Sequence, residues 1–419
     1  MEEILRILKK VIPAPLFRAL QPYYHLLLSY IGTLFYRFPS KKLYVAGITG
    51  TKGKSSTAEI LNAILEGAGY KTAMVNTIRF KTGSESKENL RKMTMPGRLF
   101  MQRFMRNAIR EGCTHLILEM TSEGTKQYRH KNIELDALIF TNISPEHIES
   151  HGSFEKYLFA KLKLRDALSS SIKKDKVVIS NFDDGHGKLF LKANVEHKIT
   201  YSLDEVFVET TYPSISFSYE DFTYTSPFQG EFNLYNILSA IKLARHLDIE
   251  KQTIANALKK INTIPGRVEY VDAGQKFKVV VDYAHTKDSL EKLYKTFEEK
   301  HTICVLGSTG GGRDTWKRPE MGKAAEENCN KVILTDEDPY DEDPEKIVRE
   351  MAEGMKKKPE IIMDRREAIA TAFKYAKDSS IVLITGKGTD PYIMRANGTK
   401  ETWSDAITAY EELEKYISG

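Results

Sequence analysis

Apolar runs and helical patterns alternate along most of the chain from Lys42 onward. Runs such as LYVA, THLILE and ALIF each end in small or polar residues, and stretches with helical spacing lie between them. Buried parallel strands are typically continuous in apolar residues, whereas amphipathic helices repeat them every three to four positions. The pattern predicts an α/β fold in which strands alternate with helices.

Changes in this pattern predict three segments. A helical N-terminal segment covers residues 1–40, one α/β domain covers 41–264, and a second α/β domain covers 265–419. Residues 199–228, rich in Thr, Tyr and Val, are expected to form antiparallel strands. In the last segment, several strands end in small or acidic residues, and ligands collect at such strand ends in open α/β sheets.

The N-terminal segment contains an apolar and aromatic run, YYHLLLSYIGTLFYRF, at residues 23–38. The run is shorter than the about 20 residues that a membrane-spanning helix needs. Two interpretations stay open: a helix packed on the body of the protein, and an interfacial helix on a membrane with basic residues beside it. No export signal of the usual layout is present.

Composition and charge narrow the classes of partner. The net charge of +5 arises from 62 basic and 57 acidic residues, and so small an excess gives no indication of nucleic acid. The hydrophobic fraction of 41% is that of an ordinary soluble globular protein. Cys113, Cys304 and Cys329 have no paired spacing, which indicates a reducing compartment and no zinc site.

The stretch GITGTKGKSSTAEI, residues 47–60, joins a predicted strand to a predicted helix. A glycine-rich turn presents backbone N–H groups to an anion, and the helix N-terminus adds partial positive charge. Lys54 is expected to reach the outer phosphates of a nucleotide, and Ser55 offers a hydroxyl to magnesium. The standard spacing requires glycine at position 48, where this chain has Ile48, so an incidental turn stays an alternative.

This variant, GITGTKGKSST, resembles the ATP loop of the Mur ligase family, which joins amino acids to a carboxylate at the expense of ATP. Similar motifs follow in order: LEMTSEG, FTNISPEHIESHGSFEKYLFAKLKL, GEFNLYNILSA, IPGRVE, VVVDYAHTKDSLEK, GSTGGGRDTWKRPEMG, LTDEDPYDEDP and LITGKGTDPY. DYAHTKDSLEK and RDTWKRPEMG are most similar to the branch that adds the third residue of the peptidoglycan stem peptide. The resemblance implies a central P-loop ATPase-like α/β domain and a C-terminal Rossmann-like α/β domain.

The resemblance also implies the chemistry. Transfer of the γ-phosphoryl group of ATP turns a carboxylate into an acyl phosphate, which an amine then attacks, so the protein mainly positions reactants and neutralises charge. The implied catalytic residues are Lys54, Glu119, His147 and Lys161, and the ligands of two magnesium ions are Ser55, Glu119, His147 and Lys161, with Lys161 carbamylated. The implied nucleotide contacts are Gly50, Thr51, Lys52, Gly53, Lys54, Ser55, Ser56, Asn233, Asn236, Arg267, Asp282 and His285. His151 matches a family histidine whose role is open.

The alternatives to these catalytic and metal-binding roles are a solvated glutamate at 119, a loop histidine at 147 and a surface lysine at 161. The acceptor contacts implied by the family are Thr94, Met95, Ser122 and Arg129, and the contacts to the incoming amino acid are Arg313, Asp338, Tyr340 and Asp390. Enzymes that use meso-diaminopimelate have Asp-Asn-Pro-Arg where this chain has Glu-Asp-Pro-Tyr. Tyr340 lacks the cationic fork for a distal carboxylate, so an amino acid with a cationic side chain is expected. A solvated acidic loop is the alternative.

Full-length members of this branch begin with a UDP-binding domain, and the helical pattern of residues 1–40 predicts that this chain lacks one. A ligase with a lipid-linked or amino-acid-polymer acceptor, as in cyanophycin synthesis, is one alternative, and a non-catalytic nucleotide-binding homologue is another. The expected partners are small molecules: a muramyl-peptide-like acceptor and an amino acid. The expected location is the cytoplasm, with peripheral contact at the inner membrane face through residues 23–38 under the interfacial interpretation. The sequence gives no oligomeric state.

Overall fold

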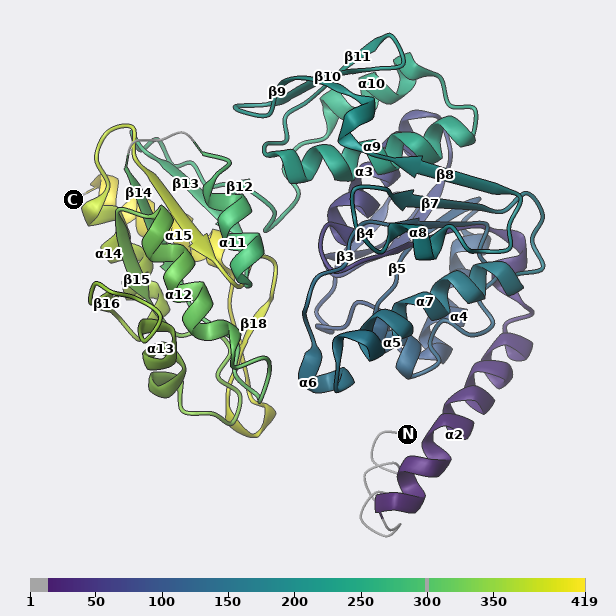
Figure 1. The fold of residues 1–419 in the computed structure, drawn as a ribbon, viewed down its shortest axis with the longest axis horizontal. Helices are drawn as coiled ribbons and strands as arrows, with labels where there is room; N and C mark the ends of the chain where they lie inside the picture. The colour runs from purple at the N-terminus through teal and green to yellow at the C-terminus, as the bar shows by residue number, and fades with distance from the viewer. Residues whose placement is uncertain (1–13, 298–300, 419) are drawn as a thin grey trace. The chain divides into compact units, whose positions relative to one another are not determined.

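The computed structural model describes residues 14–297 and 301–418, so the predicted segment 1–40 is described from residue 14 onward. The described residues form two compact units, each with its own sheet (Figure 1). The N-terminal unit comprises Met1–Ser144, Glu155–Ser202 and Leu238–Ile254, and the C-terminal unit comprises Pro145–Phe154, Leu203–Ile237 and Ala255–Gly419. Some segments before residue 265 therefore group with the C-terminal unit, and the predicted domain boundary at 264/265 stays a prediction.

An eight-stranded sheet in the order β4-β3-β2-β5-β1-β6-β7-β8 forms the core of the N-terminal unit. The strands are β1 Tyr44–Thr49, β2 Thr72–Val75, β3 Arg79–Thr82, β4 Glu85–Glu88, β5 His115–Glu119, β6 Ala137–Phe140, β7 Val177–Asn181 and β8 His197–Tyr201. From β2 to β8 in this order, neighbouring strands pair in parallel. Strand β3 runs antiparallel to both of its neighbours, β2 and β4. The prediction of buried parallel strands is confirmed at β5 and β6, where every residue is buried.

The helices of this unit connect the strands. They are α3 Lys54–Gly67, α4 Arg98–Arg110, α5 Ser122–Lys126, α7 Phe154–Ser170, α8 Gly187–Phe190, α9 Glu231–His246, whose first residues belong to the other unit, and α10 Lys251–Lys260, which belongs to the other unit from Ala255 onward. Helix α3 packs on β1, β2 and β5 through a face of buried residues, as its amphipathic pattern predicts. The loops after β1 and β5 lie at the same edge of the sheet, because Ile48 pairs with Glu119 in register.

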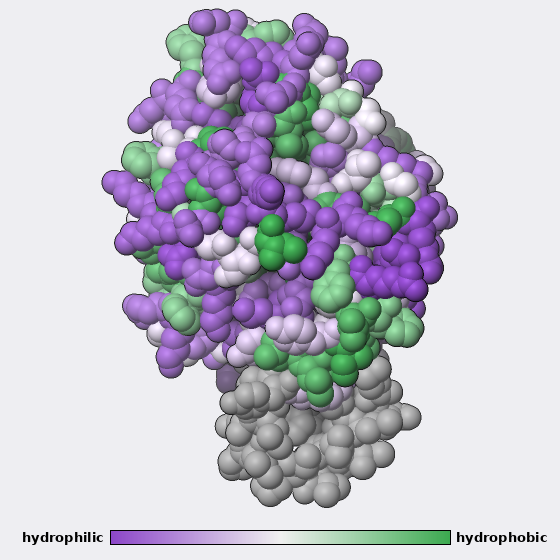
Figure 2. All heavy atoms as spheres, turned by 90° about the vertical axis from the view of Figure 1, so that its right-hand side faces the viewer, coloured by the Kyte–Doolittle hydropathy of each residue, from purple (hydrophilic) through white to green (hydrophobic). Residues whose placement is uncertain are grey.

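Helix α2, Ala14–Phe35, precedes the sheet and is followed by the short helix η1, Pro39–Lys42. It lies against α4, and Gly32 lets the two backbones approach, since a Cβ at Gly32 would come within 2.9 Å of the Leu99 side chain. Its packed face also includes Ser29, whose hydroxyl donates to the carbonyl of Lys131. Figure 2 shows the face on the right-hand side of Figure 1, where a group of hydrophobic residues lies in the lower part of the view. No helix in the described ranges is both long enough and apolar enough to cross a bilayer.

A six-stranded sheet in the order β12-β13-β17-β14-β15-β16 forms the core of the C-terminal unit, parallel except at β12. The strands are β12 Glu269–Tyr270, β13 Lys278–Asp282, β14 Thr302–Leu306, β15 Lys331–Leu334, β16 Glu360–Ile361 and β17 Ile381–Thr385, and the helices are α11 Lys287–Tyr294, α12 Lys317–Asn328, α13 Pro344–Ala352, α14 Arg365–Tyr375 and α15 Asp405–Ser418. Helices α11 to α13 contribute to one apolar core of this unit, and α14 and α15 contribute to another. This layering confirms the predicted Rossmann-like α/β fold.

Smaller elements complete the C-terminal unit. They are α6 Ile148–His151, η2 Leu203–Glu205, β9 Phe207–Thr210, β10 Ile215–Tyr219, β11 Phe222–Ser226, β18 Tyr392–Met394, η3 Ala396–Gly398 and β19 Lys400–Thr402. Strands β9 to β11 form an antiparallel sheet, and β18 pairs antiparallel with β19. The antiparallel strands predicted within residues 199–228 are therefore confirmed, apart from β8, which joins the parallel sheet.

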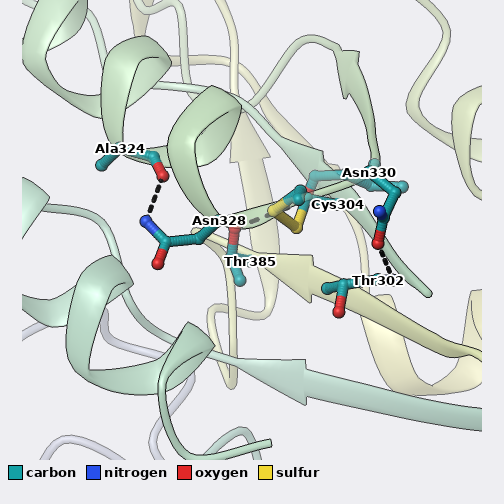
Figure 3. Close-up of a disulfide and its surroundings, with 8 residues drawn as sticks. Thr302, Cys304, Ala324, Asn328, Asn330 and Thr385 are labelled. Atoms are coloured by element: carbon teal, nitrogen blue, oxygen red, sulfur yellow. Dashed lines mark hydrogen bonds between the residues drawn. A yellow bond between two sulfur atoms is a disulfide. The ribbon is translucent and has the colours of Figure 1, made fainter. Parts of the chain in front are cut away.

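The structure corrects the interpretation of the cysteines as unpaired. Cys304 and Cys329 form a disulfide with their Cα atoms 6.1 Å apart (Figure 3). Cys113 is a buried free thiol. The sequence separation of 25 residues is that of one strand–helix crossover, because Cys304 lies in β14 and Cys329 directly follows α12. Spacing rules designed for short motifs do not detect such a pair, since the fold and not the local sequence brings it together.

Candidate active site

The loop from β1 to α3 has the backbone of an anion-binding turn. Gly50 has φ 153°, and Gly53, the residue before α3, has φ 82°, a left-handed conformation that glycine adopts without strain. Across the sheet edge, Asn142 anchors the loop by accepting hydrogen bonds from Thr51 N at 2.8 Å and Lys52 N at 2.9 Å. Within the described chain no side chain caps α3, and its first turn has no acidic residue. The helix N-terminus therefore fits a phosphate group.

Lys54, Ser55 and Glu119 lie together at this edge, as predicted. The Ser55 hydroxyl donates to Glu119 Oε2 at 2.8 Å, and Lys54 Nζ lies 3.9 Å from Glu119 Oε1. Glu119 is only 2% exposed, which rules out the alternative of a solvated loop residue. Two buried oxygen ligands beside a lysine match the preference of magnesium for oxygen. Ser56 is buried in the first turn of α3, below the loop.

Thr77, which the sequence analysis missed, connects Glu119, a predicted metal ligand, to Thr94, a predicted acceptor contact. Its backbone N–H donates to Glu119 Oε2 at 2.9 Å, and its hydroxyl donates to both carboxylate oxygens at 3.1 Å. The same hydroxyl lies 2.8 Å from the hydroxyl of Thr94. Thr77 follows β2 in no recognisable motif, so only the parallel pairing of β2 with β5 could reveal it.

Lys161 projects from α7 toward the same loop. It is 2% exposed, and its Nζ donates to the carbonyl of Gly50 at 2.6 Å. The ammonium lies 4.8 Å from the ring centroid of Tyr157, whose hydroxyl is 2.9 Å from that of Thr51. The alternative of a surface lysine is therefore wrong. Tyr157 is a second residue that the sequence analysis missed, although one helical turn separates it from Lys161.

The other predicted acceptor contacts also lie in the N-terminal unit. Arg129 donates from Nη1 to the carbonyl of Met95 and from Nη2 to Gln127 Oε1 at 2.6 Å. Ser122, the first residue of α5, is buried. The sulfur of Met95 accepts from the backbone N–H of Thr121 at 3.3 Å. Residues 94–95 therefore connect Arg129 with the Thr77–Glu119 cluster.

His147 lies in the C-terminal unit with the segment Pro145–Phe154. Its backbone N–H donates to Asp314 Oδ2 at 2.8 Å. His147 directly precedes α6 and has a left-handed backbone conformation with φ 59°. Burial and a hydrogen bond to Asp314 raise the pKa of the neighbouring Glu149 carboxyl. His151 is buried at the end of α6. Asp314 was missed because its role depends on a segment about 170 positions away.

Four of the predicted nucleotide contacts in the C-terminal unit make hydrogen bonds to each other or to neighbouring residues. Asn236 Nδ2 donates to Asn233 Oδ1 at 3.1 Å. Asp282, at the end of β13, accepts from the backbone N–H groups of Val268 at 2.8 Å and Ala284 at 2.7 Å. His285 Nε2 lies 2.9 Å from Glu146 Oε1.

Arg267 and Asp390 lie around Tyr283. The Arg267 guanidinium is 4.3 Å from the ring centroid of Tyr283. The negative charge of Asp390, together with burial, raises the pKa of the Tyr283 hydroxyl well above its usual value. The half-buried Tyr283 therefore has a cation over its ring and a carboxylate acting on its hydroxyl.

The predicted amino-acid residues are charged but internally paired. Asp338 Oδ1 accepts from Lys387 Nζ at 2.7 Å and from the backbone N–H of Met394 at 2.8 Å. The Arg313 guanidinium lies 5.2 Å from the ring centroid of Tyr340. The alternative of a solvated acidic loop does not hold at Asp338, which is 3% exposed. Its negative charge is balanced within the fold, which removes the argument for an incoming cationic side chain there.

The predicted site residues thus divide between the two units. The first contains Gly50, Thr51, Lys52, Gly53, Lys54, Ser55, Ser56, Thr94, Met95, Glu119, Ser122, Arg129 and Lys161, and the second contains His147, Asn233, Asn236, Arg267, Asp282, His285, Arg313, Asp338, Tyr340 and Asp390. The first group combines a phosphate loop, two oxygen ligands and two lysines, and this donor set fits a nucleoside triphosphate with magnesium.

Two family models match the chain: the Mur ligase middle domain over residues 48–244 and the Mur ligase, glutamate ligase domain over residues 266–388. The chain belongs to the Mur ligase family. The UDP-N-acetylmuramoyl-L-alanyl-D-glutamate–2,6-diaminopimelate ligase of Aquifex aeolicus is 36% identical over 392 residues, which are 90% of this chain and 79% of that relative. The UDP-N-acetylmuramyl-tripeptide synthetase of a Roseiflexus species is 31% identical over 433 residues, covering 96% of this Mur ligase and 84% of that relative.

A solved structure of a UDP-N-acetylmuramoyl-L-alanyl-D-glutamate–2,6-diaminopimelate ligase superposes on this Mur ligase with a TM-score of 0.61. The two sequences are 28% identical, and the match covers 90% of this chain and 79% of the other. The resemblance inferred from the sequence motifs is therefore confirmed, as is the ligase class: this Mur ligase is an ATP-dependent enzyme that forms carbon–nitrogen bonds.

Proposed function

We propose that this Mur ligase adds an amino acid to a muramyl-peptide-like carboxylate during the synthesis of peptidoglycan precursors in the cytoplasm. The observation that carries the proposal is the Ser55–Glu119 oxygen pair beside Lys54 at the uncapped N-terminus of α3. The names of the relatives, UDP-muramyl peptide ligases at 31% to 36% identity, supply the class of acceptor.

In the proposed reaction, the residues of the N-terminal unit neutralise and orient the charged reactants. The backbone N–H groups at Gly53 and the ammonium of Lys54 would hold the phosphates, and Ser55 and Glu119 would hold a magnesium ion, which would neutralise charge on the transferred phosphoryl group. Thr77 fixes the Glu119 carboxylate through both oxygens. Lys161, in carbamate form, would supply oxygen ligands for a second magnesium. The acceptor carboxylate takes the γ-phosphoryl group of ATP, and ADP leaves. The amine of the incoming amino acid then attacks the acyl carbon, the amide bond forms, and inorganic phosphate and a proton are released.

The incoming amino acid is best tested with 2,6-diaminopimelate first. Asp338 is paired with Lys387 and does not offer a free carboxylate to a cationic side chain. Arg313 offers an exposed guanidinium beside Tyr340, and a guanidinium can pair with a carboxylate on the incoming amino acid. Lysine and ornithine are the comparison substrates.

The proposal predicts that phosphate release from ATP requires acceptor and amino acid together. The measurement is phosphate release with UDP-linked, unlinked and lipid-linked muramyl dipeptides, each with diaminopimelate, lysine or ornithine. Little release is expected when either partner is omitted, because the acyl phosphate forms only on a bound carboxylate. ATP turnover that is independent of both partners, or no turnover with any pair, would contradict the proposal and favour an amino-acid-polymer ligase or a non-catalytic nucleotide-binding homologue.

We further propose that α2 is interfacial and binds the surface of a membrane, as one interpretation of residues 23–38 holds. The amphipathicity of the helix is inverted: Ser29, Gly32 and Thr33 face the protein, and large apolar residues face solvent. Exposed fractions are 58% for Leu27, 58% for Tyr30, 50% for Ile31, 69% for Leu34, 75% for Phe35 and 41% for Phe38. Burying these fractions is worth roughly 1 kcal/mol per side chain.

Basic residues beside this apolar face indicate that the membrane surface it binds is anionic. Arg37, Lys41 and Lys42 are exposed directly after this apolar face. Basic residues beside a shallow apolar face are typical of helices that bind anionic bilayers in the interface plane. Such binding would bring a ligase to a lipid-linked acceptor at the inner face of the membrane.

Vesicle flotation tests this proposal. The wild type is expected to float with phosphatidylglycerol vesicles and less with phosphatidylcholine vesicles, and the double variant Leu34→Glu/Phe35→Glu is expected to stay in the dense fraction. Phe207→Glu is the matched control, because Phe207 is 71% exposed in the other unit. Equal flotation of the wild type and the double variant would contradict the proposal, as would a wild type that does not float.

A further inference from the structure

A group of buried polar atoms without partners lies where α2 meets α4 and the loop after α5. Both ring nitrogens of His25, Nε and Nη2 of Arg98, and Nε of Arg129 are buried and have no hydrogen-bond partner among the described residues. Arg98 is 8% exposed. Buried polar groups in native proteins are nearly always satisfied, so such a concentration calls for a missing partner.

All three side chains are donors or potential cations, and they act on one another. The pKa of His25 is lowered to about 4 by burial and by the charges of Arg98 and Arg129, and burial together with Arg129 lowers the pKa of Arg98 to about 10. Among the residues that the structure describes, neither guanidinium has a carboxylate within ion-pair distance, and Glu123 pairs with Lys126. A buried guanidinium, Arg98, and a half-buried one, Arg129, neither with a carboxylate partner in the described part of the chain, favour the entry of an anion.

The backbone adds to this preference. Arg98 is the first residue of α4, which has no acidic residue in its first turn and no side-chain cap in the described structure. The free N–H groups and the helix dipole attract negative charge to the position of Arg98. The helix end thus reinforces the two guanidinium groups.

We propose that His25, Arg98 and Arg129 bind an oxyanion of the acceptor, either a carboxylate or a phosphate, and that α2 is thereby part of the acceptor site. This inference rests on the proposed function, since it assigns the anion to the acceptor. Its position supports the assignment: Arg129 donates to the carbonyl of Met95, and the adjacent Thr94 contacts Thr77, which holds Glu119. An acceptor with its reacting carboxylate near Glu119 would extend a second anionic group toward Arg98.

The test is Arg98→Met, measured for stability and for binding. Methionine keeps much of the apolar stem and removes the unpaired charge, so the melting temperature of the ligand-free protein is expected to rise. The Kd for the acceptor, measured by calorimetry without ATP, is expected to increase about 10-fold to 100-fold. His25→Leu should weaken the same binding, whereas Arg110→Met, at the exposed end of α4, should leave it unchanged.

Two acceptors distinguish the source of the oxyanion. If Arg98→Met weakens the binding of UDP-N-acetylmuramoyl-L-alanyl-D-glutamate and of the same muramyl dipeptide without UDP equally, the bound oxyanion is a carboxylate. If it weakens the binding of the UDP-linked acceptor alone, the bound oxyanion is a phosphate. Inorganic phosphate, as a third probe, should raise the melting temperature of the wild type more than that of Arg98→Met.

Unchanged binding of all three probes by Arg98→Met would overturn the inference, and so would a lower melting temperature with unchanged binding, which indicates a structural arginine. These results are distinct from a failure of the proposed function. A variant with normal acceptor binding in an active ligase contradicts only the oxyanion site, whereas a phosphate-dependent stability difference in a chain without ligase turnover contradicts only the proposed function.

Discussion

Lys54→Ala is expected to lower kcat for acceptor-dependent ATP turnover by about 10³-fold. Lys54 Nζ is held near the helix N-terminus by the carbonyl of Thr51 at 2.9 Å and by Glu119 at 3.9 Å. In this position its charge can follow the negative charge that develops on the transferred phosphoryl group, and alanine leaves water in its place. The KM for ATP should change less than kcat, because the backbone N–H groups of the loop still hold the phosphates.

The fold should tolerate this change. Glu119 keeps Ser55 and Thr77 as hydrogen-bond donors, so the melting temperature of Lys54→Ala should stay close to that of the wild type. Lys71→Ala, an exposed lysine before β2 in the same unit, is the control and should retain full turnover. Full turnover by Lys54→Ala would contradict the assignment of the phosphate loop.

Much of the fold follows from local pattern. The continuous apolar runs of β1, β5 and β6 can pack only as buried strands, and the glycine-rich turn before α3 needs the left-handed conformation that Gly53 adopts. Motif residues at strand ends, such as Glu119, were predictable because parallel strands bring their carboxyl ends to one edge.

The partners of these residues were not predictable in the same way. Thr77 and Asn142 contribute through side chains and backbone groups whose positions depend on strand order, which a single sequence does not reveal. Asp338 was interpreted from its charge alone, and only the structure shows that Lys387 neutralises it. The disulfide between Cys304 and Cys329 has the same origin, since one crossover brings the two positions together.

Lys161→Ala is expected to lower kcat by about 10²-fold to 10³-fold through loss of a metal-ligating carbamate. The structure explains why this lysine is suited to the modification. Its Nζ is buried beside the Gly50 carbonyl of the phosphate loop and the Tyr157 ring, so a carbamate on this lysine would place oxygen ligands next to that loop. The neutral amine can attack the carbon of CO2; an N–C bond forms, one N–H proton passes to water, and two oxygens bearing one negative charge result. That carboxylate can ligate magnesium, which an ammonium group cannot do.

Lys163→Ala is the matched control, because Lys163 lies two positions further along α7 and its Nζ is 5.5 Å from the ring centroid of Phe159, away from the loop. It should keep full turnover, while the wild type should lose activity in CO2-free buffer and regain it with bicarbonate. With ¹³C-bicarbonate, a carbamate signal should appear in the NMR spectra of the wild type and Lys163→Ala and be absent from Lys161→Ala. A wild type that shows no carbamate signal and is insensitive to bicarbonate would exclude the modification, and a fully active Lys161→Ala would exclude the residue from the metal site.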